Sequence, residues 1–311
     1  MIFRFPRIDL TEPLQVALLA AALLLTWFAV RLIAKKLFKP SEFELFHNTI
    51  QIDGFDVYYK QLGYGPDVLL IHGIGASQYC WRLLAPLLAE KYHVTIIDLP
   101  GFGQSSKLLD ADYDLDSQGE RLYKIICELK LVKPSLVGSS MGGALAFWIA
   151  KNYPKKISKV CGISPAVNPK LVPRAISKMS WTSAVVTTLV NELTMKQVLR
   201  NLYNDKSLVS SVTIANYLRP YVKNKNAIKV FFKALKTLKD PRLPELFSHL
   251  STPTMVLYGL QDKTVPKRKL TPFLDLNPNC IYDETNGGHH LMEDNPDWVA
   301  KKLHWFFKLR S

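Results

Sequence analysis

The sequence predicts an α/β protein with a mostly parallel central sheet flanked by helices, an inserted helical cap and an N-terminal membrane helix. Short apolar runs alternate with helix-like stretches along most of the chain, which is typical of a parallel sheet covered on both faces. This alternation stops at about residues 165–250, where the sequence becomes helix-like, and an uncharged apolar run occupies residues 14–30. These changes divide the chain into an anchor (1–45), a first core part (46–164), a cap (165–250) and a second core part (251–311).

The N-terminal apolar run is long enough for a membrane anchor. Extended through Ala34, with Arg31 snorkelling, it reaches across a hydrocarbon core of roughly 30 Å. A cleaved secretory signal is the main alternative, but the basic flank after the run lacks a small-residue cleavage site. Two basic residues precede the run and four follow it, so we expect a single-pass anchor with the chain after it on the cytoplasmic side.

The first core part begins with a hairpin. The turn dipeptide Asp53-Gly54 separates strand-like segments at 49–53 and 55–61. Strands and helices then alternate, with strands expected at 68–71, 94–98, 135–137 and 159–163, and helices near 77–90, 116–129 and 143–151.

A glycine-flanked loop follows the buried strand at 68–71. In His72-Gly73-Ile74-Gly75 the two glycines allow close backbone approach, so the N–H of Ile74 is a candidate hydrogen-bond donor to a substrate. Taken alone, the loop is equally consistent with an ordinary turn and a structural histidine. Its interpretation depends on what lies downstream.

Downstream, Gly138-Ser139-Ser140-Met141-Gly142 joins a strand to a helix in the Gly-x-Ser-x-Gly pattern of a nucleophile elbow. The serine of such an elbow holds a strained backbone, and a Cβ at the flanking glycines would collide with neighbouring elements. We therefore predict that Ser140 is a nucleophile. The N–H groups of Met141 and Ile74 are then the two donors of an oxyanion hole.

The expected cap is strongly basic. Residues 196–239 contain eight lysines, two arginines and one acidic residue, within a chain of net charge +14. One helical stripe there is basic (Lys225, Lys229, Lys233, Lys236) and the opposite one apolar (Ile228, Phe231, Phe232, Leu235). Such a helix either packs its apolar stripe inside the cap or lies on an anionic membrane. We expect no nucleic acid partner, because no nucleic-acid-binding motif accompanies the charge.

The second core part supplies the partners that a nucleophilic serine needs, in the chain order Ser, Asp, His. Asp262 ends the loop after an apolar strand that begins at Thr254, and His289 lies in a glycine-rich loop after a strand at 280–283. His290 is an alternative base, since only one of two adjacent histidines can face the serine. We choose His289, because it follows the glycine pair directly and precedes Asp294 and Pro296, and we expect His290 to be a packed or solvated neighbour.

From about residue 46 to 311 the chain resembles an α/β-hydrolase. Besides the elbow, acid and histidine, residues 94–105 resemble a strand signature of that family, to which Asp98 belongs as a structural residue. Because a serine occupies the elbow, the resemblance argues against haloalkane dehalogenases and epoxide hydrolases, whose nucleophile is an aspartate. The anchor and the sequence Gly138-Ser139-Ser140-Met141-Gly142-Gly143 resemble the membrane-bound monoacylglycerol lipase type of the α/β-hydrolase-domain family.

The resemblance implies a lipid ester substrate reached from the bilayer, with Ser140, Asp262 and His289 as catalytic residues and no cofactor or metal. A soluble-substrate esterase, a thioesterase or a carbon–carbon bond hydrolase could use the same residues. A non-catalytic, membrane-tethered binding protein is an alternative of another class. The widely spaced Cys80, Cys127, Cys161 and Cys280 are expected to be buried free thiols.

Overall fold

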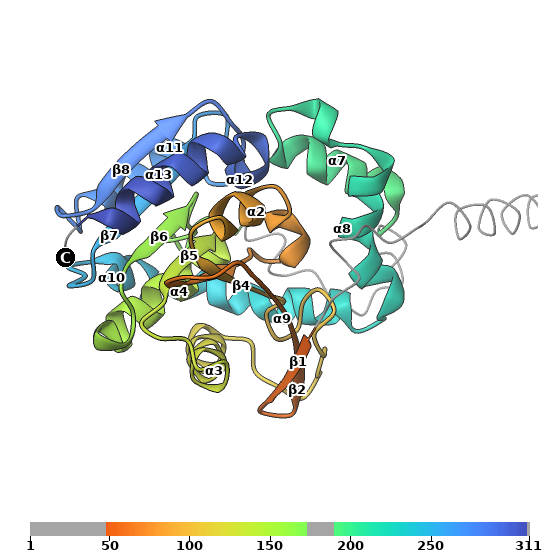
Figure 1. Cartoon of the computed structure of the whole chain (residues 1–311). Coiled ribbons are helices and arrows are strands. Elements are labelled where there is room, and N and C mark those ends of the chain that lie inside the picture. The colour runs from red at the N-terminus through yellow and green to blue at the C-terminus, as the bar shows by residue number, and fades with distance from the viewer. Residues whose placement is uncertain (1–47, 173–189, 310–311) are drawn as a thin grey trace, which may run out of the picture. The chain divides into compact units, whose positions relative to one another are not determined.

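The computed structural model describes residues 48–172 and 190–309, and its centre is one eight-stranded sheet (Figure 1). The strand order is β1-β2-β4-β3-β5-β6-β7-β8, antiparallel between β1, β2 and β4 and parallel from β4 to β8. The strands are β1 Asn48–Ile52, β2 Phe55–Leu62, β3 Asp67–Ile71, β4 His93–Ile97, β5 Ser135–Ser139, β6 Val160–Ile163, β7 Thr254–Gly259 and β8 Ile281–Thr285. The predicted mostly parallel sheet is therefore confirmed.

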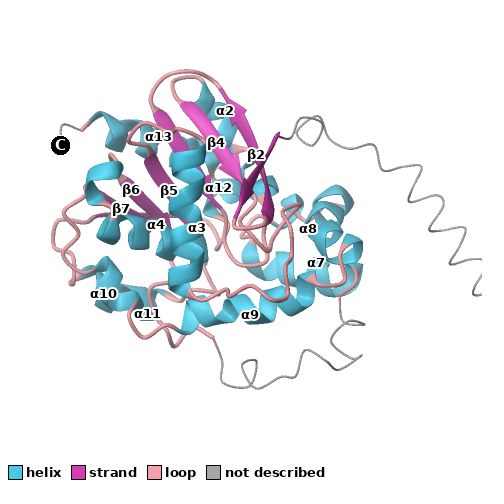
Figure 2. Cartoon of the chain, turned by 90° about the horizontal axis from the view of Figure 1, so that it is seen from below, coloured by secondary structure: helices cyan, strands magenta, loops and turns pink. Residues whose placement is uncertain are grey.

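Helices cover both faces of the sheet (Figures 1 and 2). On one face α3 packs against α4 and α4 against α10, and on the other α2 packs against α13. Their bounds are α2 Leu84–Ala89, α3 Leu115–Glu128, α4 Met141–Asn152, α10 Leu243–Phe247 and α13 Pro296–Lys308. Two short helices of the C-terminal part are α11 Lys267–Leu274 and α12 Leu291–Asp294.

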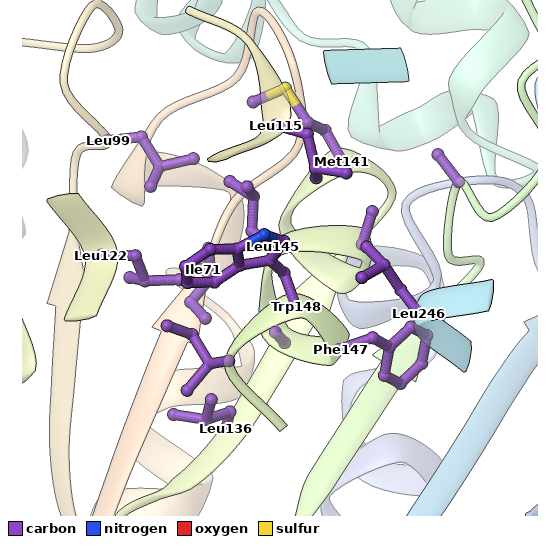
Figure 3. Packing of buried hydrophobic residues seen from close by; sticks show 14 of the residues in the cluster. Ile71, Leu99, Leu115, Leu122, Leu136, Met141, Leu145, Phe147, Trp148 and Leu246 are labelled. Carbon is purple, nitrogen blue, oxygen red and sulfur yellow. The ribbon is translucent and has the colours of Figure 1, made fainter. Parts of the chain in front are cut away.

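Helix α4 carries the predicted nucleophile at its N-terminus and is buried from Met141 to Ala150. Its side chains belong to the main hydrophobic core, in which Trp148, Leu145 and Ile71 lie together (Figure 3). A Cβ on Gly119 of α3 would stand 2.4 Å from the Trp148 ring, so that glycine lets α3 approach closely. Because α4 is enclosed on all sides, the turn at its start is held firmly.

The described residues between β6 and β7 form helices joined by loops and contain no strand. They include α7 Glu192–Leu202, α8 Ser211–Lys223 and α9 Ala227–Lys239 before α10. The apolar stripe of α9 faces inward, since Leu235 is buried and the other three members line a cavity. The Lys233 ammonium donates hydrogen bonds to the carbonyls of Leu109 and Ala111. Of the two interpretations of this helix, the structure agrees with inward packing. The boundaries of the four expected segments stay predictions.

The predicted hairpin is present, because both Asp53 (φ 49°) and Gly54 (φ 80°) adopt the positive φ that a tight turn requires. The single helix predicted at 77–90 is wrong. That stretch is a 3-10 turn at Gln78–Trp81 followed by α2. All four residues of the turn are buried, whereas an α-helix packed on a sheet buries only one face.

The expectation of four buried thiols is wrong in part. Cys80 and Cys161 are buried, Cys280 is half-buried and Cys127 is exposed, because it lies on the outer face of α3. The predicted membrane anchor falls outside the described residues. Within the part of the chain that the structure describes, none of the helices is sufficiently long and apolar to cross a membrane.

Candidate active site

Ser140 forms the sharp turn between β5 and α4. Its backbone (φ 52°, ψ −117°) lies in a region that residues with a Cβ rarely adopt. A Cβ on Gly138 would stand 2.1 Å from the carbonyl oxygen of Gly142, and one on Gly142 would stand 2.2 Å from that of Ile71. Both glycines are therefore required for the turn, which presents Ser140 at the carboxyl edge of the sheet.

Asp262 and His289 form a buried dyad. His289 Nδ1 lies 2.8 Å from Asp262 Oδ2, and Asp262 Oδ1 accepts hydrogen bonds from the N–H groups of Thr264 and Val265 at 2.7 and 2.9 Å. A carboxylate only accepts, so Nδ1 carries the proton and Nε2 is left as the acceptor that a general base needs. Burial alone would raise the pKa of Asp262, but His289 and the Val265 N–H hold that pKa below its ordinary value.

The loops that carry the dyad are tied together. The Gln261 N–H donates to the Gly287 carbonyl at 2.9 Å, and the Gly287 N–H donates to Gln261 Oε1 at 2.7 Å. Asp294 accepts a hydrogen bond from the Gly288 N–H at 2.6 Å. These bonds position His289 without using its ring.

Ser140 and the dyad lie at one edge of the sheet. Ser140 follows β5, Asp262 follows β7 and His289 follows β8, and these strands are parallel. Among the described residues, no hydrogen bond of 3.5 Å or less joins Ser140 to His289. Contacts between a nucleophile and its base often tighten only when substrate binds.

Two backbone N–H groups are available beside Ser140. Within the described chain, neither Ile74 nor Met141 uses its N–H in a hydrogen bond. A Cβ on Gly73 would stand 3.0 Å from Ser140 Cβ, so the loop after β3 passes directly beside Ser140. Both N–H groups therefore remain available as the predicted oxyanion donors.

His72 orients that loop, a role that the sequence left open. Its Nδ1 donates to the Gly73 carbonyl at 2.7 Å, while Nε2 accepts from the Leu99 N–H at 3.0 Å. The carbonyl of Gly73 and the N–H of Ile74 belong to one planar trans peptide unit, in which the two groups point in opposite directions. A hydrogen bond that fixes the Gly73 carbonyl therefore also fixes the direction of the Ile74 N–H. Burial lowers the pKa of His72, which favours this neutral form.

Asp98 occupies the structural position expected for it. Its carboxylate accepts hydrogen bonds from the N–H groups of Gln78 and Gln104, both at 2.7 Å. A Cβ on Gly103 would stand 2.1 Å from the Asp98 carboxyl carbon. Asp98 thus organises two loops and does not face Ser140.

His290 points into a different network from His289. Its Nδ1 lies 3.0 Å from both the Tyr217 hydroxyl and Glu293 Oε1, and Glu293 pairs with Arg82. Arg82, Tyr217 and Glu293 were not predicted from the sequence, because contacts between residues as distant as 82 and 293 leave no local pattern. Among the described residues, no group of three histidine, cysteine or acidic side chains is arranged to hold a metal.

A cavity of about 510 Å³ opens beside residues 72–75, the predicted oxyanion loop. Ile74 and His290 line it, and most of its remaining wall is apolar. The other lining residues are Gly75, Ala76, Val190, Thr194, Met195, Val198, Leu199, Leu202, Tyr217, Tyr221, Ile228, Phe231 and Phe232. Such a volume accommodates a drug-sized or lipid-like molecule.

Comparison with known proteins agrees with this geometry. The chain is 27% identical over 292 residues to the 2-hydroxy-6-oxo-6-(2'-aminophenyl)hexa-2,4-dienoic acid hydrolase of Metapseudomonas resinovorans, covering 89% of this chain and 96% of that protein. It is 24% identical over 253 residues to monoacylglycerol lipase ABHD6 of Homo sapiens, covering 78% and 75% of the two chains. A solved structure of a membrane phospholipase A superimposes with a TM-score of 0.69 at 25% identity, covering 94% of this chain and 95% of that one.

Residues 66–296 match the alpha/beta hydrolase fold family. That range includes the oxyanion loop, the elbow, Asp262 and His289, and the sheet order and strained serine agree with it. The chain therefore belongs to the alpha/beta hydrolase fold family.

Proposed function

We propose that this protein is a membrane-associated serine hydrolase that cleaves carboxylic esters, in particular lipid esters such as monoacylglycerols. The observation that carries the proposal is the buried Asp262–His289 dyad at the sheet edge that also bears the strained Ser140. A serine in such a position is activated by a base whose tautomer is fixed by a carboxylate.

In the proposed mechanism His289 Nε2 takes the proton of Ser140, and Ser140 Oγ attacks the ester carbonyl carbon. The N–H groups of Ile74 and Met141 stabilise the oxygen on which negative charge develops. His289 then gives its proton to the leaving alcohol. Water, deprotonated by His289, releases the acid from the acyl-enzyme.

Three features favour a lipid substrate. The cavity beside Ile74 is large and mostly apolar. The apolar run at 14–30 would keep the enzyme at a bilayer, with the catalytic domain on its cytoplasmic side. Two of the similar proteins are a monoacylglycerol lipase and a membrane phospholipase A.

A fluorophosphonate probe, which reacts with activated serines, tests the catalytic assignment. We expect it to label the wild-type protein in detergent, but neither Ser140→Ala nor His289→Ala. Ser139→Ala is a matched control, because Ser139 is the adjacent serine and its buried hydroxyl has no hydrogen-bond partner among the described residues. Labelling that persists in Ser140→Ala, or that is absent from folded wild-type protein, would disprove the assignment.

Membrane association has its own test. Two aspartates in place of Leu23 and Leu24 would put charges at the centre of the apolar run, where each costs about 3 kcal/mol. We expect the wild-type chain to remain with membranes after a carbonate wash and the double variant to be released. Equal behaviour of the two proteins would refute an anchor at 14–30.

The similarity to the dienoic acid hydrolase favours a second candidate, a carbon–carbon bond hydrolase that uses the same three residues on a soluble substrate. A direct comparison of turnover on a monoacylglycerol and on a dienoic acid of that type separates the two. Turnover of the dienoic acid alone would replace the lipid ester proposal with this second function.

A further inference from the structure

At the cavity wall, the side chains of Arg82, Tyr217, His290 and Glu293 form a polar network. Glu293 forms an ion pair with Arg82, and the Tyr217 hydroxyl donates to Glu293 Oε1. The same carboxylate oxygen lies 3.0 Å from His290 Nδ1. The Glu293 side chain is fully buried and that of His290 is 7% exposed. The network takes no part in the ester mechanism described above.

These contacts determine which nitrogen of His290 carries the proton. A carboxylate only accepts hydrogen bonds, so both the Tyr217 hydroxyl and His290 Nδ1 must direct a hydrogen toward Glu293. Nδ1 is then protonated, and Nε2 has a free lone pair. Burial lowers the pKa of His290 to about 3, so the imidazole remains neutral over the range in which such hydrolases work.

The lone pair of Nε2 is free to accept a hydrogen bond from a molecule in the cavity. His290 lines the cavity, and its Nε2 makes no hydrogen bond to any described residue. Nε2 retains some accessible surface, because it is not one of the fully enclosed side-chain atoms without a hydrogen-bond partner in the described chain. The two lining tyrosines already donate their protons, Tyr217 to Glu293 and Tyr221 to the Gly75 carbonyl at 3.1 Å. Nε2 is therefore an unpaired acceptor in a mostly apolar wall.

We propose that His290 is a specificity residue whose Nε2 accepts a hydrogen bond from a hydroxyl group of the substrate, so that the enzyme prefers hydroxyl-bearing esters. The inference rests on the proposed ester hydrolysis at Ser140. His290 is well placed for this role, because its ring centroid lies 5.8 Å from that of the proposed base His289. An ester without a hydroxyl would cover Nε2 and leave a buried acceptor unpaired, which disfavours its transition state.

The hydroxyl could belong to the alcohol part of the ester or to its acyl chain, and two substrate pairs distinguish these sources. The first pair is monodecanoylglycerol and propyl decanoate, which differ in the hydroxyls of the alcohol. The second is the methyl ester of decanoic acid and that of its terminal hydroxy derivative. Values of kcat/KM are measured for the detergent-solubilised full chain, and fluorophosphonate titration counts the active sites in every preparation.

We expect the wild-type enzyme to prefer the hydroxylated member of one pair by about tenfold, the effect of one hydrogen bond. His290→Phe keeps an aromatic ring but has no acceptor, so the ratio should fall to about one. His290→Gln offers a carbonyl oxygen near the position of Nε2 and should restore most of the preference. Tyr217→Phe keeps the imidazole of His290 but removes the hydroxyl beside its Nδ1, so the ring is held less firmly and the ratio of kcat/KM values should be intermediate. This variant provides a second measurement if His290→Phe does not fold.

Each other outcome overturns the proposal. An unchanged ratio in folded His290→Phe shows that Nε2 does not select the hydroxyl. A wild-type ratio near one in both pairs, with active sites that titrate normally, refutes the inference but leaves ester hydrolysis standing. Wild-type protein that does not titrate and cleaves none of the four esters refutes the proposed function and this inference with it.

Discussion

The two hydrogen bonds of His72 lead to a prediction that separates catalysis from stability, because one of them orients the proposed oxyanion donor Ile74. His72 makes two hydrogen bonds with different roles. The bond from Nδ1 to the Gly73 carbonyl fixes the direction of the Ile74 N–H and so should affect catalysis. The bond that Nε2 accepts from the buried Leu99 N–H should affect stability. Asparagine can place a donor near the position of Nδ1, and glutamine can place an acceptor near that of Nε2. The variants His72→Asn and His72→Gln thus each retain one of the two bonds.

The expected magnitudes follow from the two contacts. Loss of one oxyanion donor lowers kcat by about 100- to 1000-fold. His72→Gln should lower kcat by no more than about 100-fold, because the Ala76 N–H still holds the Gly73 carbonyl at 3.2 Å. His72→Asn should keep kcat within about tenfold of wild type, but it leaves the Leu99 N–H unpaired at a cost of about 1–3 kcal/mol of unfolding free energy.

The assay measures kcat and KM on a nitrophenyl ester and the free energy of unfolding in urea. We expect KM to change little, since the Ile74 donor acts mainly on the transition state. The reasoning fails if His72→Gln retains more kcat than His72→Asn, or if both variants lose kcat equally. Either result would mean that the hydrogen bond from His72 Nδ1 does not determine the orientation of the Gly73–Ile74 peptide.

Three further predictions concern the elbow and the dyad. Ser140→Gly should be more stable than Ser140→Ala by about 1 kcal/mol in urea unfolding, because glycine relieves the strain at φ 52°; equal or lower stability would contradict that strain. Gly142→Ala should lose about 3 kcal/mol, since its Cβ would stand 2.2 Å from the Ile71 carbonyl oxygen, and a wild-type unfolding midpoint would exclude the clash. The lowered pKa of Asp262 means that its ionised form stabilises the fold above pH about 4, and this contribution is lost as the pH falls through the folded-state pKa. Wild-type stability should therefore fall more steeply than that of Asp262→Asn below pH about 4, and parallel curves would count against the dyad.

Local sequence patterns were sufficient for much of the fold. The turn at Asp53-Gly54 and the elbow around Ser140 each depend on backbone conformations that only certain neighbouring residues permit, so a few adjacent letters identify them. Strands of a parallel sheet can also be predicted from the sequence. Both faces of such a sheet are buried, so the sequences of its strands are almost continuously apolar. The 3-10 turn at Gln78–Trp81 escaped prediction, because its form follows from burial on all sides.

The candidate site was predictable to the extent that its chemistry resides in local motifs. Ser140, Asp262 and His289 could each be proposed from a loop that follows a strand. The positioning role of His72 and the network of Arg82, Tyr217, His290 and Glu293 could not. Their partners lie on other elements, and sequence alone contains no distance between them.

The sequence by itself determined the α/β class, the serine at the elbow and the chain order of the acid and the base, because these are properties of short segments and their succession. Only the tertiary structure shows that the two adjacent histidines have different partners. Successive side chains point in different directions, so His289 meets Asp262 while His290 meets Tyr217 and Glu293. The tertiary structure also shows that the apolar stripe of α9 lies toward a cavity and not toward the outside. The sequence indicates that a helix has an apolar face, but the elements that this face contacts are distant in the chain.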